Sequence, residues 1–503
     1  MQEKNTLTEE DRGMTASGER KKIYIMYPEK IGMVSPEIYG HFTEHIGGVI
    51  YDGIWVGKDS DIPNENGFRK DIVEKLRAIK APVIRWPGGC FAEAYDWRDG
   101  IGKNRPTRIN WWQRDDGKTE SNDVGTHEFM DFCEAVGAKA YFAANLTSVT
   151  PLHIRNWMDY CLSPQGTTTL AKEREANGHP EPFDIPFWGV GNENWGGGGD
   201  MLPEHYVNEF RRFSALMKNA FPKAELFMCG ENAEDYRWTD SVIRGTCGVA
   251  TSVDGFAMHF YCGSTPGEVT GFGREDWDRQ LSQAAKMGDI INRNRHIIAG
   301  HGMEGHAKLV VDEWGCWHRG GTGPSKGEFL FEQQNTLRDA AVAALTLNIF
   351  NNNCDIVRMA NIAQLVNCLQ SLFLSCGENC IVTPTYHVFD MYKEHMGAEA
   401  VRTVIEGNEE LSSSVSVSAS VKDGKTLLTL CNLSYTDDAE ITLCGVGGFP
   451  ALPSSAEARL LSDSDLTAHN TFENPNRVKV TKRVIDPSKP FTVPKGGILS
   501  VSF

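Results

Sequence analysis

Short apolar runs and longer amphipathic segments alternate along most of the chain. The apolar runs have the length of buried strands and fall at residues 37–42, 82–86, 139–146, 186–193, 224–230, 254–261, 307–314 and 355–360. Several segments between them repeat apolar residues at i, i+3, i+4 and i+7, which predicts helices, for example at residues 68–80, 126–137, 203–220, 275–298 and 335–350. Eight strand–helix units predict a (β/α)₈ barrel, which we place at residues 37–396.

An open doubly wound sheet is the alternative architecture, because it also alternates strands and helices. No G-x-G-x-x-G motif follows the first predicted strand, and polar residues mark the C-terminal ends of nearly all the strands. Both observations favour the barrel, in which those ends form the active-site face.

The pattern changes in residues 397–503, where short alternating stretches are separated by Gly, Asp, Asn and Pro turns and no helical period is visible. This pattern predicts an antiparallel β-sandwich. Another alternating stretch precedes the barrel, and we expect residues 22–36 to cross over and join the sandwich as a strand. Residues 1–21 are charged and are expected to form a flexible tail.

Composition narrows the class of protein. The chain is 40% hydrophobic and 23% charged, which is typical of a soluble globular protein. Its formal net charge of −17 disfavours nucleic acid and anionic membranes as partners. The sequence contains no run of 18 apolar residues, and its beginning lacks the apolar segment of a signal peptide, so a cytoplasmic protein is expected.

The 13 cysteines are an odd number and several lie in apolar runs, so we expect most of them to be reduced and buried. Cys376 and Cys380 have no paired His or Cys motif beside them, which disfavours a zinc site there.

Two glutamates follow predicted barrel strands in unusual company. Glu193 lies in GNENW after the fourth strand, and Glu313 lies in VDEW after the seventh. Side chains at these strand ends face each other across a barrel mouth. Hydrolysis of a glycosidic bond needs one carboxylic acid and one carboxylate on opposite sides of the anomeric carbon. Either glutamate alone could serve in an ion pair or a helix cap, but the two together predict a glycosidase.

The surrounding motifs resemble those of glycoside hydrolase family 51, the intracellular α-L-arabinofuranosidases of the retaining barrel clan. The resemblance covers nearly the whole chain from about residue 22, and it rests on GHFTEHIGGVIYDGIW, RWPGGCFAEAYDWRDGIG, NWWQ, GNENW, MHFY, DEWGCW and NIAQLVN. It implies that Glu193 is the acid/base and that Glu313 is the nucleophile.

The same resemblance implies a set of substrate-binding residues: Glu44, Cys90, Asn192, Tyr261, Gln364, Trp111 and Trp317. Tyr261 would hydrogen-bond the nucleophile, and Trp111 or Trp112 would wall the pocket. Cys90 departs from the Asn that many members have, and a thiol is a weak hydrogen-bonding group. We expect His259 to be a structural histidine of the barrel mouth, since two carboxylates already fill both catalytic roles.

The activity implied is that of a retaining, exo-acting enzyme that releases L-arabinofuranose from arabinoxylan or arabinan oligosaccharides. No metal or organic cofactor is expected, and a homo-oligomer such as a hexamer is expected from the family. Alternatives on the same scaffold are a β-xylosidase, an endoglucanase or a galactofuranosidase. A non-catalytic carbohydrate-binding protein would need neither glutamate, and a metal-dependent barrel would have to use His41, His45 and His259 without a typical ligand spacing.

Overall fold

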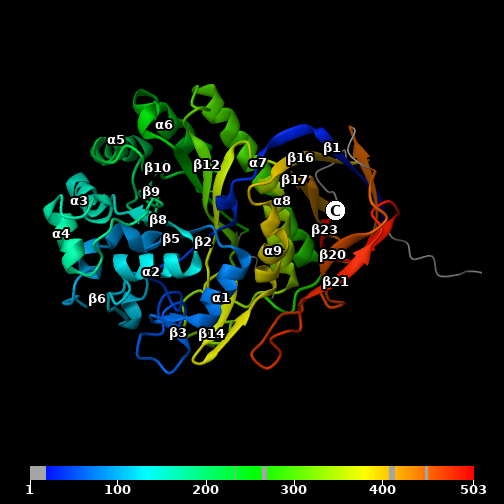
Figure 1. Ribbon diagram of the computed structural model, residues 1–503, viewed down its shortest axis with the longest axis horizontal. Helices are drawn as coiled ribbons and strands as arrows, with labels where there is room; N and C mark the ends of the chain where they lie inside the picture. The colour runs from blue at the N-terminus through cyan, green and yellow to red at the C-terminus, as the bar shows by residue number, and fades with distance from the viewer. Residues whose placement is uncertain (1–18, 233, 263–268, 407–413, 448–450) are drawn as a thin grey trace, which may run out of the picture.

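The computed structural model describes residues 19–232, 234–262, 269–406, 414–447 and 451–503. A barrel with its surrounding helices and a β-sheet unit lie side by side, and the N-terminal strand reaches from one to the other (Figure 1). Residues 1–18 of the predicted tail lie outside the described residues.

Eight strands form the closed barrel, as predicted, and they follow one another around it in chain order. Each neighbouring pair is parallel. The strands are β2 (Gly40–Phe42), β5 (Val83–Trp86), β8 (Lys139–Ala144), β9 (Phe187–Val190), β10 (Glu225–Met228), β11 (Gly255–Cys262), β12 (Lys308–Cys316) and β13 (Val357–Ile362). The first is shorter than predicted, because Pro36–Tyr39 forms a 3₁₀ helix, for which Pro36 supplies the pre-set φ of a first turn.

Helices surround the barrel. They are α1 (Lys70–Ile79), α2 (Thr126–Val136), α3 (Pro151–Leu162), α4 (Thr169–Ala176), α5 (Pro203–Ala220), α6 (Tyr236–Thr246), α7 (Arg274–Gly300), α8 (Leu337–Asn351) and α9 (Pro384–Tyr392). Most of them bury one apolar face, as the sequence period predicts, whereas α8 is buried over nearly its whole length. Among the described residues, none of the helices combines the length and the apolar character that crossing a membrane requires.

The interior of the barrel is filled by side chains from six strands. They are Val83, Tyr141, Phe187, Phe227, Val310 and Met359, and each is at most 1% exposed. The barrel is therefore a packed core with room for a ligand only at its mouth. Three short hairpins extend from its loops, formed by β3 (Asn64–Glu65) with β4 (Phe68–Arg69), β6 (Arg108–Ile109) with β7 (Thr119–Glu120), and β14 (Phe373–Cys376) with β15 (Asn379–Val382).

The second unit is a nine-stranded sheet with the order β21-β20-β23-β18-β17-β16-β1-β19-β22. Its strands are β1 (Glu19–Met33), β16 (Glu399–Ile405), β17 (Val415–Lys422), β18 (Lys425–Asn432), β19 (Ala439–Val446), β20 (Ala456–Leu461), β21 (Val480–Ile485), β22 (Phe491–Val493) and β23 (Ile498–Ser502). Apolar residues from strands far apart in this order meet in one core, including Ile23, Ile441, Leu428 and Leu460. The sheet therefore folds over itself as a β-sandwich, the architecture that the sequence predicts.

Strand β1 differs from its predicted start. It runs antiparallel to β16 and parallel to β19, and its pairing with β19 begins at Glu19↔Ala439. Residues 19–21 therefore belong to the sheet and not to a tail. A charged stretch can form a strand here because Glu19, Arg20 and Lys21 each pair with a residue of β19, and the backbone hydrogen bonds between the two strands do not depend on side-chain polarity.

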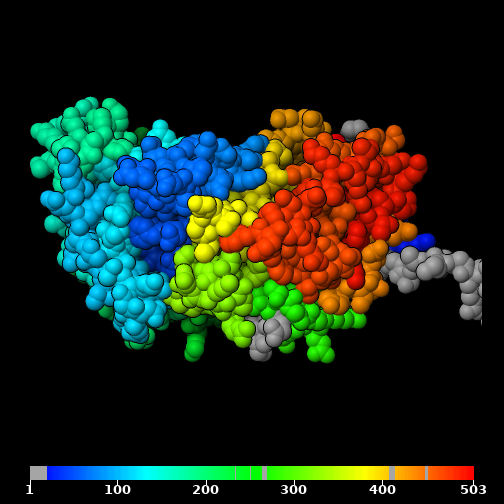
Figure 2. Space-filling model, turned by 90° about the horizontal axis from the view of Figure 1, so that it is seen from below, coloured from blue at the N-terminus to red at the C-terminus, as the bar shows by residue number. Residues whose placement is uncertain are grey.

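Polar contacts join the sandwich to α7 and α8. Figure 2 shows the sandwich, in orange and red, lying directly against the rest of the molecule. On α8, the amides of Asn348 and Asn351 donate to the hydroxyls of Ser416 and Ser418, both at 3.1 Å. On α7, Trp277 Nε1 donates to the carbonyl of Leu433 at 2.7 Å. Each of these groups is matched by a partner of opposite hydrogen-bonding character, as buried polar groups require.

Candidate active site

Glu193 and Glu313 meet at the C-terminal mouth of the barrel. Glu193 follows β9, and Glu313 lies near the end of β12. One carboxylate oxygen of Glu193 lies within 4.8 Å of one carboxylate oxygen of Glu313, and a ring nitrogen of His259 lies within the same distance of both oxygens. His259 Nδ1 is 2.8 Å from Glu193 Oε1 and 3.5 Å from Glu313 Oε2. The tertiary structure thus brings together two carboxylates that are 313 − 193 = 120 positions apart in the sequence.

Glu313 is held by hydrogen bonds to both of its carboxylate oxygens. Arg85 donates to Oε1 at 2.9 Å, and the hydroxyl of Tyr261 donates to Oε2 at 2.7 Å. Burial alone would raise the pKa of Glu313, but the charges of His259 and Arg85 and the bond from Tyr261 outweigh it and hold that pKa below its ordinary value. Glu313 is therefore ionised at neutral pH, as a nucleophile must be.

Glu193 lies in a different environment. Its side chain is 21% exposed, against 8% for Glu313. Its polar neighbours are His259 and the thiol of Cys90, whose sulfur lies 3.4 Å from Oε2. The backbone of Glu193 has φ = +43°, a left-handed conformation that few non-glycine residues adopt. Such a conformation persists where surrounding contacts enforce it, and it frequently marks a functional site.

Glu44 is a third carboxylate that lines the pocket. Its Oε1 accepts from the backbone amides of Gly89 and Phe91, both at 3.0 Å, and its Oε2 accepts from Gln364 Nε2 at 3.2 Å. Burial and the nearby charge of Glu313 raise the pKa of Glu44 to about 7. A Cβ on Gly89 would lie 2.8 Å from Glu313 Oε1, so glycine is required for this close approach.

The pocket between these carboxylates also has aromatic and apolar walls. Its lining residues are Glu44, Ile46, Gly89, Cys90, Trp112, Glu193, Tyr261, Glu313, Trp317, Phe331, Gln364, Cys368 and Leu369. Trp317 contacts both Tyr261 and Phe331 edge-on, with ring centroids 5.1 and 5.2 Å apart. Trp112 lines the pocket, whereas Trp111 lies behind it in an edge-on contact at 4.8 Å. Which of two neighbouring tryptophans faces a pocket depends on the conformation of the loop backbone, and the sequence pattern does not specify it.

Asn192 does not line the pocket directly. Its Oδ1 accepts from Arg85 at 2.6 Å, and its Nδ2 lies 3.8 Å from the sulfur of Cys90. Arg85 thus links Glu313 on one strand with Asn192 beside the other glutamate. Sequence reasoning left out Arg85, and it assigned His259 a structural role although His259 bridges both carboxylates. An arginine within an apolar barrel strand is itself a signal, because a buried charge needs a partner.

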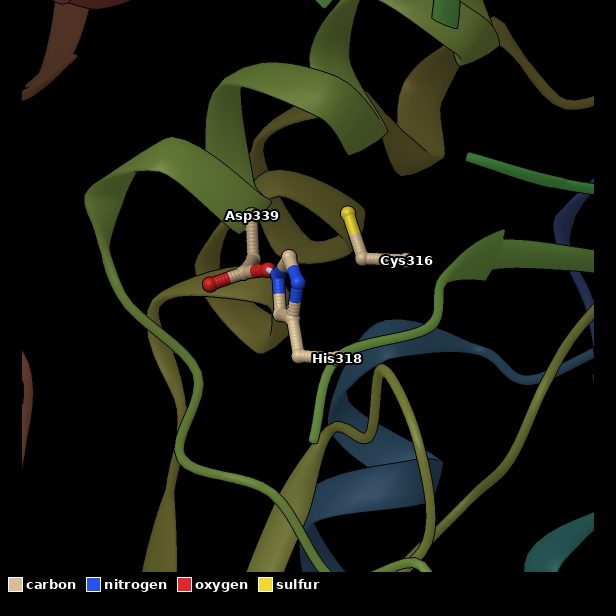
Figure 3. Close-up of side chains that lie close together, drawn as sticks. All are labelled: Cys316, His318 and Asp339. Carbon is tan, nitrogen blue, oxygen red and sulfur yellow. Dashed lines mark hydrogen bonds and ion pairs between the residues drawn. The ribbon is translucent and has the colours of Figure 1, made fainter. Parts of the chain in front are cut away.

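Within the described residues, two groups of side chains have donor atoms close enough to hold a metal ion. One is the trio Glu193, His259 and Glu313, and the other is Cys316, His318 and Asp339 just beyond the end of β12. Figure 3 shows the second group, in which the imidazole of His318 points at the carboxylate of Asp339 from helix α8. His318 Nε2 lies 2.9 Å from Asp339 Oδ1.

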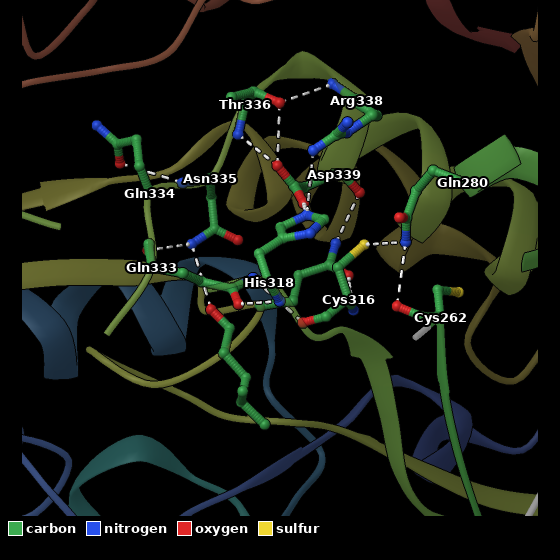
Figure 4. Close-up of polar contacts among 12 residues, drawn as sticks. Cys262, Gln280, Cys316, His318, Gln333, Gln334, Asn335, Thr336, Arg338 and Asp339 are labelled. Carbon is green, nitrogen blue, oxygen red and sulfur yellow. Dashed lines mark hydrogen bonds and ion pairs between the residues drawn. The ribbon is translucent and has the colours of Figure 1, made fainter. Parts of the chain in front are cut away.

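The surroundings of this second group favour a buried ion pair over a cation site. Arg338 NH2 lies 3.4 Å from His318 Nε2, where a metal ion would meet an existing positive charge (Figure 4). Burial would lower the pKa of His318, but the charge and hydrogen bond of Asp339 raise it to about 9. The other oxygen of Asp339 accepts from the backbone of Thr336 at 2.6 Å and so caps α8.

Comparisons with known proteins agree with this fold and with the family that the sequence motifs resemble. Family models describe residues 75–270 as an α-L-arabinofuranosidase 1 domain and residues 312–495 as an α-L-arabinofuranosidase C-terminal domain. The chain is 37% identical over 464 residues to an "Intracellular exo-alpha-L-arabinofuranosidase" of Bacteroides ovatus, covering 89% of this chain and 88% of the relative.

Solved structures match over almost the whole length. The family 51 arabinofuranosidase of Xanthomonas axonopodis pv. citri superposes with a TM-score of 0.88 at 36% identity, covering 96% of this chain and 99% of that one. The Thermotoga maritima α-L-arabinofuranosidase, solved with arabinose, gives 0.85 at 29% identity and covers the same shares. By sequence and by structure, the chain belongs to glycoside hydrolase family 51 and is an α-L-arabinofuranosidase, an enzyme that releases arabinofuranose.

Proposed function

We propose that Glu313 is the nucleophile and Glu193 the acid/base of a retaining double displacement. The observation that carries this proposal is the separation of the two carboxylates, whose nearest oxygens lie within 4.8 Å. Retaining glycosidases hold their carboxyl groups about 5–5.5 Å apart, whereas inverting enzymes leave about 6.5–9.5 Å for a water molecule. The short separation leaves no room for that water.

In the first step, an oxygen of Glu313 attacks the anomeric carbon while the bond to the leaving oxygen breaks. The leaving oxygen takes the proton of Glu193, and an arabinosyl ester forms on Glu313. In the second step, ionised Glu193 removes a proton from water. The resulting hydroxide adds to the anomeric carbon, the ester bond breaks, and Glu313 is released as a carboxylate with overall retention.

The neighbours of the two glutamates support this division of roles. Arg85 and Tyr261 each hydrogen-bond Glu313 and favour its ionised form. Among the described residues, the side-chain contacts of Glu193 are with the Cys90 thiol and His259. Glu193 is also the more exposed of the two glutamates, so it can exchange protons with water. We assign Glu44, Gln364 and Asn192 to the sugar hydroxyls, directly or through their neighbours, and Trp112 and Trp317 to the apolar faces of the substrate.

The stereochemistry of the product tests the mechanism. Proton NMR during hydrolysis of an aryl α-L-arabinofuranoside should show α-arabinofuranose first, before mutarotation. With azide present, Glu193→Ala should yield an arabinosyl azide of retained configuration, and Glu313→Ala one of inverted configuration. An initial β-product from the native enzyme, or the opposite assignment of azides, would contradict the proposal.

We also propose that the enzyme acts from non-reducing ends on arabinoxylan or arabinan oligosaccharides inside the cytoplasm. The name of the Bacteroides ovatus relative, which includes "intracellular" and "exo", supports both parts. Comparing arabinofuranosyl, xylosyl and galactofuranosyl nitrophenyl glycosides, together with linear arabinan and arabinoxylan fragments, tests the substrate range. Cell fractionation tests the location. A hexameric assembly stays a prediction from the family, which light scattering coupled to size exclusion would measure.

A further inference from the structure

Glu93 is a buried carboxylate next to the active site that the two-carboxylate mechanism does not use. It lies in the 3₁₀ turn Cys90–Ala94 after β5 and is 4% exposed. Its four hydrogen-bond donors are neutral amides, three from the backbone and one from a side chain. A buried carboxylate needs such donors, and its hydrogen bonds in turn hold each donor amide in place.

The four donors come from two other strand ends. Glu93 Oε2 accepts from the backbone amides of Leu146 and Thr147, after β8, at 2.7 and 2.8 Å. Glu93 Oε1 accepts from the backbone amide of Asn192 at 2.6 Å and from Asn194 Nδ2 at 3.0 Å, both after β9. One carboxylate thus ties together the loops that follow β5, β8 and β9.

The residues held by Oε1 are the two neighbours of Glu193 in the chain. The loop beyond them is closed on the same network, because Asn194 Nδ2 also donates to the carbonyl of Gly198 at 2.8 Å. The amides of Gly196 and Gly198 donate back to the carbonyl of Glu193 at 2.8 and 3.1 Å. The left-handed backbone of Glu193, with φ = +43°, is therefore fixed from both sides.

We propose that Glu93 is a positioning residue for the acid/base step, holding the backbone on both sides of Glu193 so that its carboxyl group points at the leaving oxygen. This inference rests on the acid/base role proposed for Glu193. The turn that contains Glu93 also supplies Cys90, whose sulfur lies 3.4 Å from Glu193 Oε2. The turn Cys90–Ala94 therefore acts on Glu193 in two ways: Glu93 holds the residues on either side of it, and Cys90 contacts its carboxyl group.

Glu93→Gln tests the proposal, because the added NH₂ group faces N–H donors in one of the two loops. If the acid is misplaced, hydrolysis slows most for substrates whose leaving group needs a proton. We expect kcat/KM for phenyl α-L-arabinofuranoside to fall about 10–100-fold, since general acid catalysis contributes roughly 10²–10⁴-fold. For the 2,4-dinitrophenyl substrate, whose leaving group needs no proton, we expect a loss of less than about threefold.

Two further variants sharpen the measurement. Asn194→Ala removes one of the four donors and leaves the carboxylate in place, so it should show the same dependence on leaving group to a smaller extent, and it serves if Glu93→Gln does not fold. Glu231→Gln is the matched control, because Glu231 is also buried and bonded to neutral donors, but these come from Thr239 on α6 and Asn294 on α7. Its ratio of the two kcat/KM values should equal that of the native enzyme.

The outcomes separate the two proposals. Equal losses on both substrates for Glu93→Gln and Asn194→Ala would show a merely structural role and overturn this inference. Glu193→Ala is measured beside them as the reference for a lost acid. If Glu193→Ala shows a strong leaving-group dependence and the Glu93 and Asn194 variants show none, only the positioning role fails. If Glu193→Ala shows none, the acid/base assignment itself fails.

Discussion

Two histidine–carboxylate sites lie near the end of β12, and we propose a catalytic role for one and a structural role for the other. At the barrel mouth, His259 lies 2.8 Å from Glu193, with Arg85 bound to Glu313. Just beyond, His318 lies 2.9 Å from Asp339, and Arg338 is its neighbour. The side chains present the same chemical groups in both places.

Access to the pocket distinguishes the two sites. Glu193 and Glu313 line the pocket, and Glu193 is partly exposed. His318 and Asp339 have side-chain exposures of 2% and 0%, and the second oxygen of Asp339 is occupied by the cap of α8. Substrate can reach the first site but not the second, so we expect the first to be catalytic and the second to stabilise the contact between the end of β12 and α8. The following variants test this contrast.

Replacing Glu313, the proposed nucleophile, should have the largest effect. Glu313→Ala removes the group that we propose forms the covalent intermediate, so kcat on 4-nitrophenyl α-L-arabinofuranoside should fall roughly 10⁴-fold or more. Some loss of unfolding free energy is expected as well, because the buried Arg85 keeps Asp312 at 3.6 Å but loses its closer carboxylate partner. Residual activity within about 100-fold of the native rate would contradict the assignment.

At the sealed site of His318 and Asp339, a substitution should reduce stability and leave activity nearly unchanged. His318→Asn leaves Asp339 buried with a weaker partner, and breaking a buried ion pair costs about 3–5 kcal/mol of unfolding free energy. Urea titration followed by circular dichroism measures this loss, while kcat/KM below the transition should stay within about threefold of the native value. A large fall in kcat/KM without a loss of stability would show that the clamp also acts in catalysis.

Arg85→Lys should weaken catalysis to a smaller degree than loss of the nucleophile. Lysine keeps a positive charge but cannot donate to Glu313 and Asn192 together with the fork of a guanidinium. We expect kcat/KM to fall about 10–100-fold, and the acidic limb of its pH profile to move to higher pH because the ionised form of Glu313 is less favoured. An unchanged acidic limb would show that Arg85 does not influence the ionisation of Glu313.

The pH dependence of stability separates an ion-paired histidine from a neutral buried one. The folded pKa of His318 is raised to about 9, so its stabilisation is complete below the unfolded pKa of about 6.5 and is lost as pH rises towards 9. Burial lowers the pKa of His395 to about 3. In the described part of the chain, its ring nitrogens bond the hydroxyls of Ser420 and Thr429. Its contribution is complete above about pH 6.5 and falls as the pH drops below that value.

The differences in unfolding free energy between the native enzyme and His318→Asn or His395→Asn, measured from pH 4 to 9, should therefore have opposite slopes. Parallel slopes would mean that His318 is not charged in the folded protein.

Cys90 should show the smallest effect. Cys90→Ala removes one weak thiol hydrogen bond to Glu193, so we expect kcat/KM to fall about threefold to tenfold. Cys90→Asn places there the residue that the family resemblance associates with many members. Equal kinetics of the native enzyme and both variants would show that the side chain at position 90 contributes neither to catalysis through Glu193 nor to sugar binding.

Much of the fold could be predicted because its signals are local. The eight apolar runs correspond to the eight barrel strands, and the alternating C-terminal stretches correspond to strands of the sandwich. The three short hairpins of the barrel loops were not predicted, because their strands are only two or four residues long. The predictions also ended the tail too late, since the strand pairing of residues 19–21 depends on β19, far away in the chain.

The sequence by itself determined the architecture, the family and the two glutamates, because strand periodicity and residue type are properties of short segments. Only the tertiary structure decided which side chains of the site contact one another. It placed Trp112 rather than Trp111 against the pocket, joined Arg85 to both Glu313 and Asn192, and set His259 between the two glutamates. It also sealed His318 away from substrate. Those choices depend on burial and on distances of a few ångströms between separate strand ends, which exist only once the barrel has closed.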